Sequence, residues 1–189
     1  MKNDITVVTP TIPPRGSFLQ RAVQSVSQQT LSAAALAIAV DVHRTGAAAT
    51  RQRALDTVRT PWVAFLDDDD YFMPQHLEHC LAHALETESD FVYSWFEVVG
   101  GRDPFPPTHF SRDFDPTDPI ETTVTTLVRT ELAQAVGFRA LNRGEMNSGE
   151  DRFFTLGCLA AGAKISHLKE RTWYWTHHPG NTSGLPTRW

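Results

Sequence analysis

The first half of the chain alternates short apolar runs with longer segments whose apolar residues recur every three or four positions. Runs of the first kind are typical of buried strands, and segments of the second kind are typical of amphipathic helices. Strands are predicted over residues 5–9, 36–42, 62–66 and 91–96, and helices are predicted to begin near residues 17, 47 and 74. This alternation predicts an α/β fold with a mainly parallel sheet and helices on its faces.

The second half continues this pattern after a long polar connection. Residues 100–119 are rich in Gly, Pro and Asp, and connections of this length tend to be functional or mobile. The elements predicted after it are a strand near residues 122–128, helices over 130–137 and about 150–161, and two short strands over 164–168 and 171–176. No internal repeat or second domain is visible, so residues 1–189 are predicted to form a single domain.

Polar residues stand at the ends of three predicted strands. They are Thr9-Pro10-Thr11, Asp41, and the run from Asp67 to Asp70. Ligands of open parallel sheets bind outside the carboxyl ends of the strands. The three groups are therefore expected to meet at one rim of the sheet, where a ligand would bind.

The acidic run, in the stretch AFLDDDDYFMP, is unfavourable by itself because neighbouring carboxylates resist joint ionisation. A bound Mg²⁺ or Mn²⁺ would relieve the repulsion, since carboxylate oxygens are suitable ligands for both ions. The alternative is a solvated acidic turn that caps the helix beginning near Pro74. A calcium loop does not fit, because Tyr71 and Phe72 stand where an acidic ligand and a glycine are required.

Composition limits the class of protein. Hydrophobic residues make up 41% of the 189 residues and charged residues 21%, which indicates a globular chain. No apolar run reaches membrane-spanning length and the start, MKNDITVV, lacks a signal-peptide pattern, so we expect a cytoplasmic protein. The two cysteines, Cys80 and Cys158, are predicted to be buried free thiols. The formal net charge of −5 disfavours a large nucleic-acid surface.

Four segments together resemble family 2 glycosyltransferases of the GT-A fold, across most of the chain. ITVVTPTIPPRGSFLQRAVQSVSQQT is similar to the opening strand and helix of that family, and GAAATRQRALDTVRTPWVAFLDDDDYFMPQHLE to its central block ending in the DXD metal motif. SGEDRFF resembles the "ED" catalytic motif, and YWTHHPGNTS the C-terminal His-Pro-Gly segment. The resemblance implies a single Rossmann-like GT-A domain with a mixed, mainly parallel sheet.

The resemblance assigns donor-binding roles to the first half. The Thr9–Pro10 turn would approach the nucleotide, and Asp41 would contact the nucleobase, although DVHR at residues 41–44 replaces the usual Asp-Asp-Gly-Ser. Arg51 would face the diphosphate or nucleoside, with a surface ion pair as the alternative. Asp67 or Asp68 would reach the ribose or the sugar.

The resemblance also implies a metal site and a catalytic base. Asp69 and His178 would bind Mn²⁺ or Mg²⁺, with His177 as the alternative ligand. Asp151 would take the proton from the acceptor hydroxyl in an inverting single displacement, while the metal stabilises the leaving diphosphate. A structural role for this acid stays open, because Ser148 to Asp151 also fit a capping box.

The resulting hypothesis is a metal-dependent transferase that takes a sugar from a UDP- or GDP-sugar to an acceptor glycan, protein or modified nucleic-acid base. Residues 1–98 would form the nucleotide-sugar half, and residues 99–189 the acceptor and catalytic half with a C-terminal tail. The alternatives are a nucleotidyltransferase, whose phosphate loop the stretch TPTIPPRGS fits poorly, and a non-catalytic nucleotide-sugar-binding module.

Two further patterns allow a structural and a functional interpretation. His76, His79 and His83 recur at helical spacing, and a solvated helix face is favoured over a zinc site because no ligand set accompanies them. Trp173 and Trp175 share one face of a predicted strand. Core packing is the default for this pair, and stacking on an acceptor sugar is the alternative.

Overall fold

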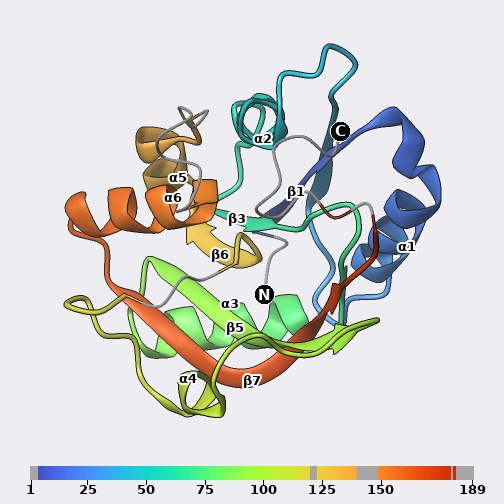
Figure 1. The fold of residues 1–189 in the computed structure, drawn as a ribbon. Helices are drawn as coiled ribbons and strands as arrows, with labels where there is room; N and C mark the ends of the chain where they lie inside the picture. Colours follow the sequence, from blue (N-terminus) through green and yellow to red (C-terminus); the bar gives the residue numbers. More distant parts are fainter. Residues whose placement is uncertain (1–3, 120–122, 140–148, 180, 182–189) are drawn as a thin grey trace.

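A seven-stranded mixed sheet forms the centre of the molecule in a computed structural model that describes residues 4–119, 123–139, 149–179 and 181 (Figure 1). Its strands run in the order β2-β1-β3-β6-β5-β7-β4. Their bounds are Ile5–Thr11 (β1), Ala35–Val40 (β2), Trp62–Phe65 (β3), Tyr71–Phe72 (β4), Phe91–Val99 (β5), Thr126–Arg129 (β6) and Ile165–Thr176 (β7). The pairs β1–β2, β1–β3 and β5–β7 are parallel, whereas β6 and β4 pair with their neighbours in the antiparallel direction.

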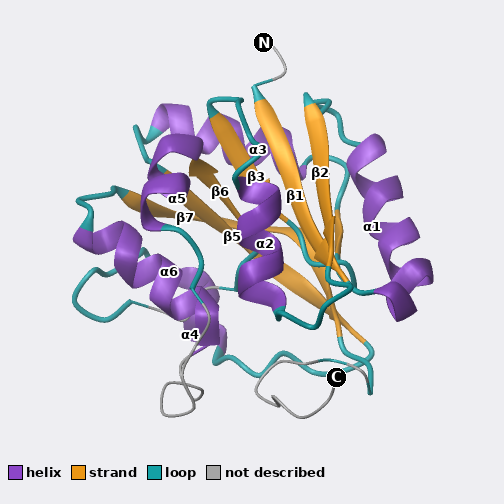
Figure 2. Cartoon of the chain, turned by 90° about the horizontal axis from the view of Figure 1, so that it is seen from above, coloured by secondary structure: helices purple, strands orange, loops and turns teal. Residues whose placement is uncertain are grey.

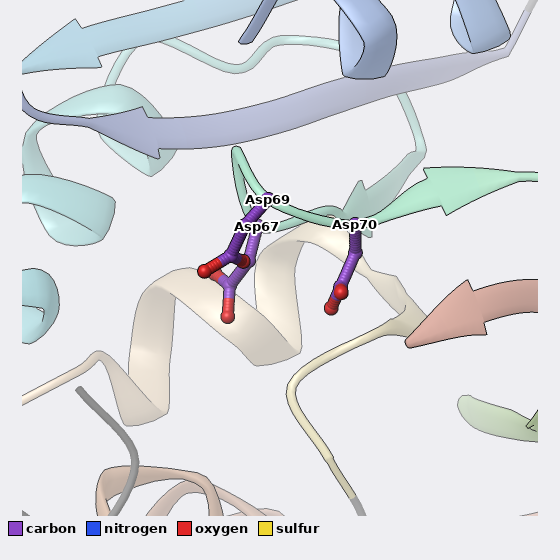
Figure 3. Close-up of side chains that lie close together, drawn as sticks. All are labelled: Asp67, Asp69 and Asp70. Carbon is purple, nitrogen blue, oxygen red and sulfur yellow. The ribbon is translucent and has the colours of Figure 1, made fainter. Parts of the chain in front are cut away.

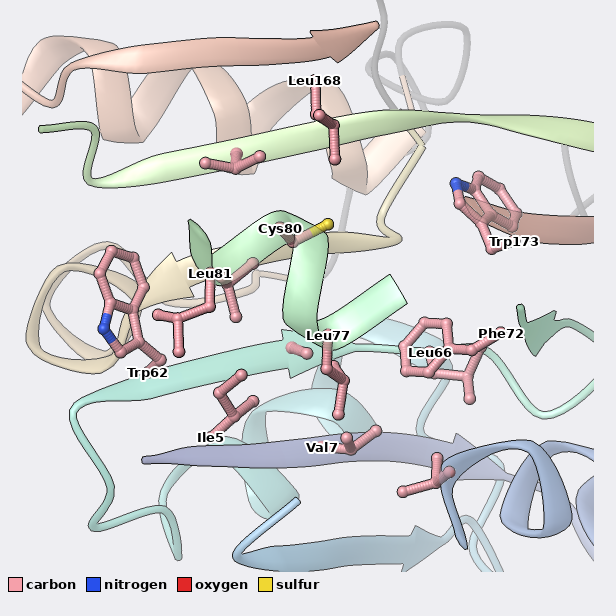
Figure 4. Packing of buried hydrophobic residues seen from close by; sticks show 14 of the residues in the cluster. Ile5, Val7, Trp62, Leu66, Phe72, Leu77, Cys80, Leu81, Leu168 and Trp173 are labelled. Atoms are coloured by element: carbon pink, nitrogen blue, oxygen red, sulfur yellow. The ribbon is translucent and has the colours of Figure 1, made fainter. Parts of the chain in front are cut away.

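Helices cover both faces of this sheet. They are α1 (Gly16–Ser27), α2 (Ala47–Leu55), α3 (His76–Glu86), α4 (Pro107–Ser111), α5 (Thr130–Val136) and α6 (Gly149–Ala160), and a 3-10 turn, η1, covers Pro13–Arg15. Buried residues of α1 and α3 pack on one face (Figure 4), whereas those of α2, α5 and α6 pack on the other. Figure 2 shows the helices on both sides of the sheet. The predicted α/β fold with a mixed, mainly parallel sheet between helices is confirmed.

Strand β1 shows how the sequence pattern produces the two cores. Ile5 and Val7 point to the α1/α3 side, while Val8 points to the α2/α6 side. All three are at most 1% exposed. Successive side chains of a strand point to opposite faces, so a continuous apolar run is required where both faces are covered. The short apolar runs in the sequence are therefore central strands.

The prediction of two short strands near the C-terminus is wrong, because residues 165–176 form one strand, β7. It runs parallel to β5 along its whole length, with register shifts on either side of Trp95. Leu168 and Arg171 pair with the neighbouring residues Ser94 and Trp95, so the two residues between them bulge out of the ladder. Polar residues in such a bulge face solvent without ending the strand.

The predicted solvated face of α3 is wrong for His76, which is 0% exposed. Its ring stacks on Phe72 at 3.9 Å, and its Nδ1 lies 2.7 Å from the hydroxyl oxygen of Thr172. The side chain of His79, by contrast, is 41% exposed and pairs with Glu170. His76 is buried because it begins the helix face that packs on the sheet. Cys80, one turn later, and Cys158 are buried free thiols, as predicted.

Burial of His76 predicts an acid-sensitive fold. Burial, and secondarily the neighbouring His79, lowers the pKa of His76 to about 3. The unfolded chain, with a His pKa of about 6.5, binds this proton more readily, so stability falls as pH decreases from about 6.5 towards 3. The slope from one such group reaches about 1.4 kcal/mol per pH unit. His76→Gln, which retains a polar group for Thr172, is expected to flatten this fall in urea unfolding at pH 7, 6, 5 and 4. Curves that stay parallel for wild type and variant would show that His76 does not titrate on unfolding.

None of the helices in the described part of the chain is long and apolar enough to cross a membrane.

Candidate active site

A pocket opens at the carboxyl ends of the central strands, where the sequence predicts a ligand rim. Its lining residues come from β1 and the turn after it, from the segment after β2 and the start of α2, from the loop after β3, and from the end of β7 and the segment after it. They are Pro10, Thr11, Ile12, Arg15, Asp41, Gly46, Ala47, Thr50, Asp67, Asp68, Asp69, Asp70, Trp175 and Asn181. Thr9 is not among them, and it is buried at 1% exposure.

Three carboxylates of the acidic run converge in this pocket. One oxygen each of Asp67, Asp69 and Asp70 lies within 4.8 Å of the others (Figure 3). The run folds into a tight turn after β3, in which the backbone N–H of Asp70 donates to the carbonyl of Asp67. Three carboxylate oxygens this close suit a hard divalent cation such as Mg²⁺ or Mn²⁺. This set fits the divalent metal predicted from the sequence; it contains the predicted ligand Asp69 and adds Asp67 and Asp70 to it.

Each carboxylate of the turn is held by a different part of the fold. Asp68 accepts hydrogen bonds from the hydroxyl of Thr11 at 2.6 Å and from Arg15 at 2.8 Å. Asp69 accepts one from the same Arg15 nitrogen at 2.9 Å. Asp70 accepts one from the backbone N–H of Thr176 at 2.8 Å. The turn is thereby fixed to β1, η1 and β7 before any ligand binds.

Burial also changes the charge balance of the turn. Burial raises the pKa of Asp68 and of Asp69 above the usual value for a carboxyl group. The pKa of Asp70 is raised well above it, first by burial and then by the charges of Asp69 and Asp67. The hydrogen bonds from Thr11, Arg15 and Thr176 act in the opposite direction. Added positive charge at this site would therefore be strongly favourable.

Arg51 lies beneath the turn as a buried cation. It is 2% exposed, and its guanidinium donates to Asp67 at 2.7 Å and to Glu150. Burial acts to lower its pKa, but the charges of Glu150 and Asp67 raise it overall. The surface ion pair considered for Arg51 is wrong, because Glu150 and the ring of Phe138 cover the guanidinium. Arg51 is not among the pocket-lining residues; it joins the end of β3 to the start of α6.

Asp41 also lines the pocket and stabilises its own turn. It is 2% exposed, and its carboxylate accepts hydrogen bonds from the backbone N–H groups of Thr45 at 2.9 Å and Gly46 at 2.7 Å. Burial acts to raise the pKa of Asp41, but these hydrogen bonds lower it overall. Gly46 has φ of 91°, a conformation that favours glycine. Asp41 therefore shapes this edge of the pocket as an ionised side chain.

The two neighbouring histidines near the C-terminus point to different places. His178 Nε2 lies 3.2 Å from an Asp69 carboxylate oxygen, and its ring stacks on Phe18 at 4.4 Å. His177 instead packs edge-on against Trp175 at 4.5 Å. A Cβ on Gly101 would collide with the His177 ring, so this glycine permits the close approach. Of the two, His178 is the one beside the acid cluster.

A second groove adjoins the pocket on the His177 side. Its lining residues are Gly100, Pro104, Trp175, His177, His178, Pro179 and Asn181, and its volume is about 550 Å³, the size of a small-ligand site. Trp175 and Asn181 line both spaces. Trp175 is half-buried and rests on Phe96, whereas Trp173 is 0% exposed. Trp173 is therefore a core residue and cannot stack on a sugar. Trp175 lines both spaces and has an accessible ring that could stack on one.

The start of α6 carries the two acids of the sequence motif. Glu150 pairs with Arg51, and Asp151 is the next residue of the first turn, with its side chain partly buried. Because Arg51 also contacts Asp67, the two acids lie on the same side of the molecule as the acidic turn. The capping hypothesis for Asp151 depends on Ser148, which lies outside the described residues.

Sequence reasoning missed Arg15, and it placed Thr11 at the ligand rim without giving it a role. Both residues hold Asp68 through hydrogen bonds. The signal was present in the stretch TPTIPPRGS, in which a hydroxyl residue ends the strand and an arginine follows a pair of prolines. Pro13 and Pro14 favour the tight turn that places Arg15 at the pocket.

The combination of this sheet, an acidic turn after its central strand and a second acid pair on a later helix defines a GT-A glycosyltransferase fold. The sequence matches the family model "Glycosyl transferase family 2" over residues 36–144, more than half of the chain. The protein belongs to this family.

Similar solved structures share the fold at low sequence identity. S. aureus TarS (residues 1–349) in complex with UDP-GlcNAc superposes with a TM-score of 0.81 and 21% identity, covering 96% of this chain and 61% of TarS. The same protein in complex with UDP gives a TM-score of 0.73 and 22% identity, covering 94% and 61%. The chain therefore spans about three-fifths of these relatives. No curated protein matches the sequence.

Proposed function

We propose that the protein is an inverting glycosyltransferase that moves a sugar from a UDP-sugar to an acceptor hydroxyl with the help of Mn²⁺ or Mg²⁺. The observation that carries the proposal is the acidic turn in the pocket, where Asp67, Asp69 and Asp70 converge beside His178 and the Arg51–Glu150 pair. In a family 2 glycosyltransferase, the acidic turn would bind the cation, and Asp151 on the nearby helix α6 would act as the base.

The donor would lie along the ends of β1 and β3. Pro10 and Asp41 line the pocket and would approach the nucleoside together with the neighbouring Thr9, and Asp67 or Asp68 would reach the ribose or sugar. TarS binds UDP-GlcNAc and UDP in its crystal structures, which supports a uridine nucleotide rather than a guanosine one. Arg51 would support the site indirectly, by holding Asp67.

Asp69 and His178 would hold the metal ion. When bound, Mn²⁺ or Mg²⁺ supplies a Lewis acid that stabilises the negative charge on the departing diphosphate. The protein's part is to keep Asp69 and His178 in place, through the stack of His178 on Phe18 and the tight turn that carries Asp69. Asp70 is tied to the backbone of Thr176 and would add charge to the same site.

Asp151 would be the base that takes the proton of the acceptor hydroxyl. The start of a helix carries partial positive charge, which favours the ionised carboxylate that a base requires. Its neighbour Glu150 forms the ion pair with Arg51 and would have a structural role. Attack from the face opposite the leaving diphosphate inverts the sugar configuration, and no covalent intermediate with the protein is needed.

The acceptor would occupy the second groove. Trp175 lines both this groove and the donor pocket, so a sugar ring stacked on it would lie next to the donor. Residues 1–98 then supply the donor-binding groups, and residues 99–189 supply the base and the acceptor groove. A glycan fits the aromatic wall best among the three acceptor classes considered.

A panel of nucleotide sugars tests the function directly. The purified protein is incubated with UDP-GlcNAc, UDP-glucose, UDP-galactose and GDP-mannose in the presence of Mn²⁺, and free nucleoside diphosphate is measured. Release of UDP from one UDP-sugar, and its loss on adding EDTA, is expected. Pyrophosphate release from UTP and a sugar phosphate would indicate a nucleotidyltransferase. Tight donor binding with neither reaction would indicate a binding module.

His178 and His177 offer a matched pair for testing the metal site. His178→Ala is expected to weaken Mn²⁺-dependent UDP binding about tenfold or more, because it removes an imidazole ligand beside Asp69. His177→Ala is expected to change it less than threefold, because that ring faces the second groove. Isothermal titration with UDP in Mn²⁺ measures both. The reverse order would move the ligand assignment to His177, and no effect from either would remove this segment from the metal site.

A further inference from the structure

Arg15 is the single basic residue among the described residues that line the donor pocket. Five aspartates line the same pocket, namely Asp41 and Asp67 to Asp70. A nucleoside diphosphate is itself negatively charged, so it cannot enter such a site unless positive charge compensates for both it and the aspartates. A metal ion supplies part of this charge. Arg15 is the cation that the protein itself provides at the pocket wall.

The position of Arg15 suits a side chain that changes partners. It ends the turn η1 directly after β1, and its side chain is 15% exposed, against 2% for Arg51. One of its terminal nitrogens, Nη1, bridges Asp68 at 2.8 Å and Asp69 at 2.9 Å. Arg51 has its two terminal nitrogens committed to two acids below the pocket. Arg15 reaches the acids from the open side.

Arg15 also binds a carboxylate oxygen that a metal ion would need. The Asp69 oxygen that accepts its hydrogen bond, Oδ2, is the same oxygen that lies 3.2 Å from His178 Nε2. Asp69 and His178 are the two proposed metal ligands. The guanidinium of Arg15 therefore pairs with a carboxylate that the metal ion would need. A divalent ion entering there competes with Arg15 for one oxygen.

We propose that Arg15 is an exchangeable cation of the donor site. It pairs with Asp68 and Asp69 while the metal is absent, and it transfers to the diphosphate of the donor when a divalent ion binds Asp69. Guanidinium groups bind phosphate oxygens through two parallel hydrogen bonds, which gives the released side chain a strong new partner. This inference rests on the proposed function and adds a mechanism that makes metal and donor bind together.

The exchange makes an unusual pair of expectations for Arg15→Gln. Mn²⁺ alone should bind more tightly, by about three- to tenfold, because its competitor for Asp69 is gone. UDP in saturating Mn²⁺ should bind about ten- to a hundredfold more weakly, because a charge-assisted hydrogen bond to phosphate is lost. Arg15→Lys should recover part of the UDP affinity, since it keeps the charge without the planar fork.

A matched control separates exchange from a general change of net charge. Arg59 is exposed and precedes β3, at the edge of the sheet opposite the pocket, and its guanidinium donates to the nearby backbone carbonyls of Asp56 and Val58. Arg59→Gln removes the same unit of charge and is expected to leave both affinities within twofold. Electron paramagnetic resonance of free Mn²⁺ measures metal binding, and isothermal titration measures UDP binding. Circular dichroism confirms that each variant is folded.

The outcomes distinguish this proposal from the proposed function. Opposite shifts of Mn²⁺ and UDP affinity in Arg15→Gln support the exchange. If wild type binds UDP with Mn²⁺ and Arg15→Gln binds both as wild type does, Arg15 is not the exchanging cation, while the glycosyltransferase assignment stands. If both affinities fall together, Arg15 merely organises the acidic turn. If wild type binds neither UDP nor GDP in Mn²⁺, the proposed function fails and the exchange fails with it.

Discussion

Replacing Asp151 with asparagine is expected to lower the rate of sugar transfer by about a hundred- to ten-thousandfold, the usual loss when a general base is removed. Asparagine has the same shape and still accepts hydrogen bonds at the start of α6, but it cannot take a proton. Donor affinity and melting temperature should therefore stay close to those of wild type. Initial transfer rates with saturating UDP-sugar, together with a UDP titration and a melting curve, measure all three quantities on one variant.

The adjacent acid provides the control for this experiment. Glu150→Gln breaks the ion pair with the buried Arg51, so its main effect should be on stability, by about 1–3 kcal/mol for a lost charged hydrogen bond. Its transfer rate per folded molecule should fall far less than that of Asp151→Asn. Near-normal transfer by a well-folded Asp151→Asn, or a larger loss of transfer in Glu150→Gln, would remove Asp151 from the role of base.

Replacing Asp69 with alanine is expected to abolish the joint stabilisation of the protein by UDP and Mn²⁺. In wild type, a ligand held at about a hundred times its dissociation constant adds roughly 2.7 kcal/mol to the free energy of unfolding. The variant lacks the carboxylate that Arg15 and His178 both contact. The metal ion therefore loses a ligand, and UDP loses the metal ion through which it would bind. Thermal melting with UDP alone, Mn²⁺ alone and both together measures the effect.

Asp56→Ala is the matched control, because Asp56 is exposed at the end of α2, away from the pocket. It should respond to UDP and Mn²⁺ as wild type does. Equal stabilisation of Asp69→Ala and wild type by the pair of ligands would place the metal elsewhere in the acidic run. Asp67→Ala and Asp70→Ala would then identify which carboxylate binds it.

The central strands could be predicted from the sequence because both of their faces are covered. An uninterrupted apolar run such as that around Val7 and Val8 suits neither a half-exposed strand nor an amphipathic helix. Two strands are expected from the sequence in place of β7 because Lys169 and Glu170 resemble a turn. In the structure these two residues form a bulge, and the pairing with β5 continues past them. Strand β4, with two residues, is too short to produce any periodic signal.

The ligand rim could also be predicted, because strand ends are local features of the sequence. The contacts that organise it could not. Arg51 and Glu150 are 99 residues apart, and no local sequence pattern indicates that they form an ion pair. The same holds for Arg15 and Asp68, which are 53 residues apart. Side chains of this kind acquire their partners only when the sheet brings distant segments together.

The buried guanidinium of Arg51 limits how the two halves of this fold can be recombined. An acceptor half taken from another family member and grafted after residue 98 must bring an acid to the position of Glu150. With an apolar residue there, Asp67 would be the one remaining acidic partner of Arg51. The free energy of unfolding would fall by up to about 3–5 kcal/mol, the cost when a buried ion pair loses a partner. Chimeric enzymes built on this scaffold should therefore be chosen by that single acid before any resemblance in the acceptor loops is considered.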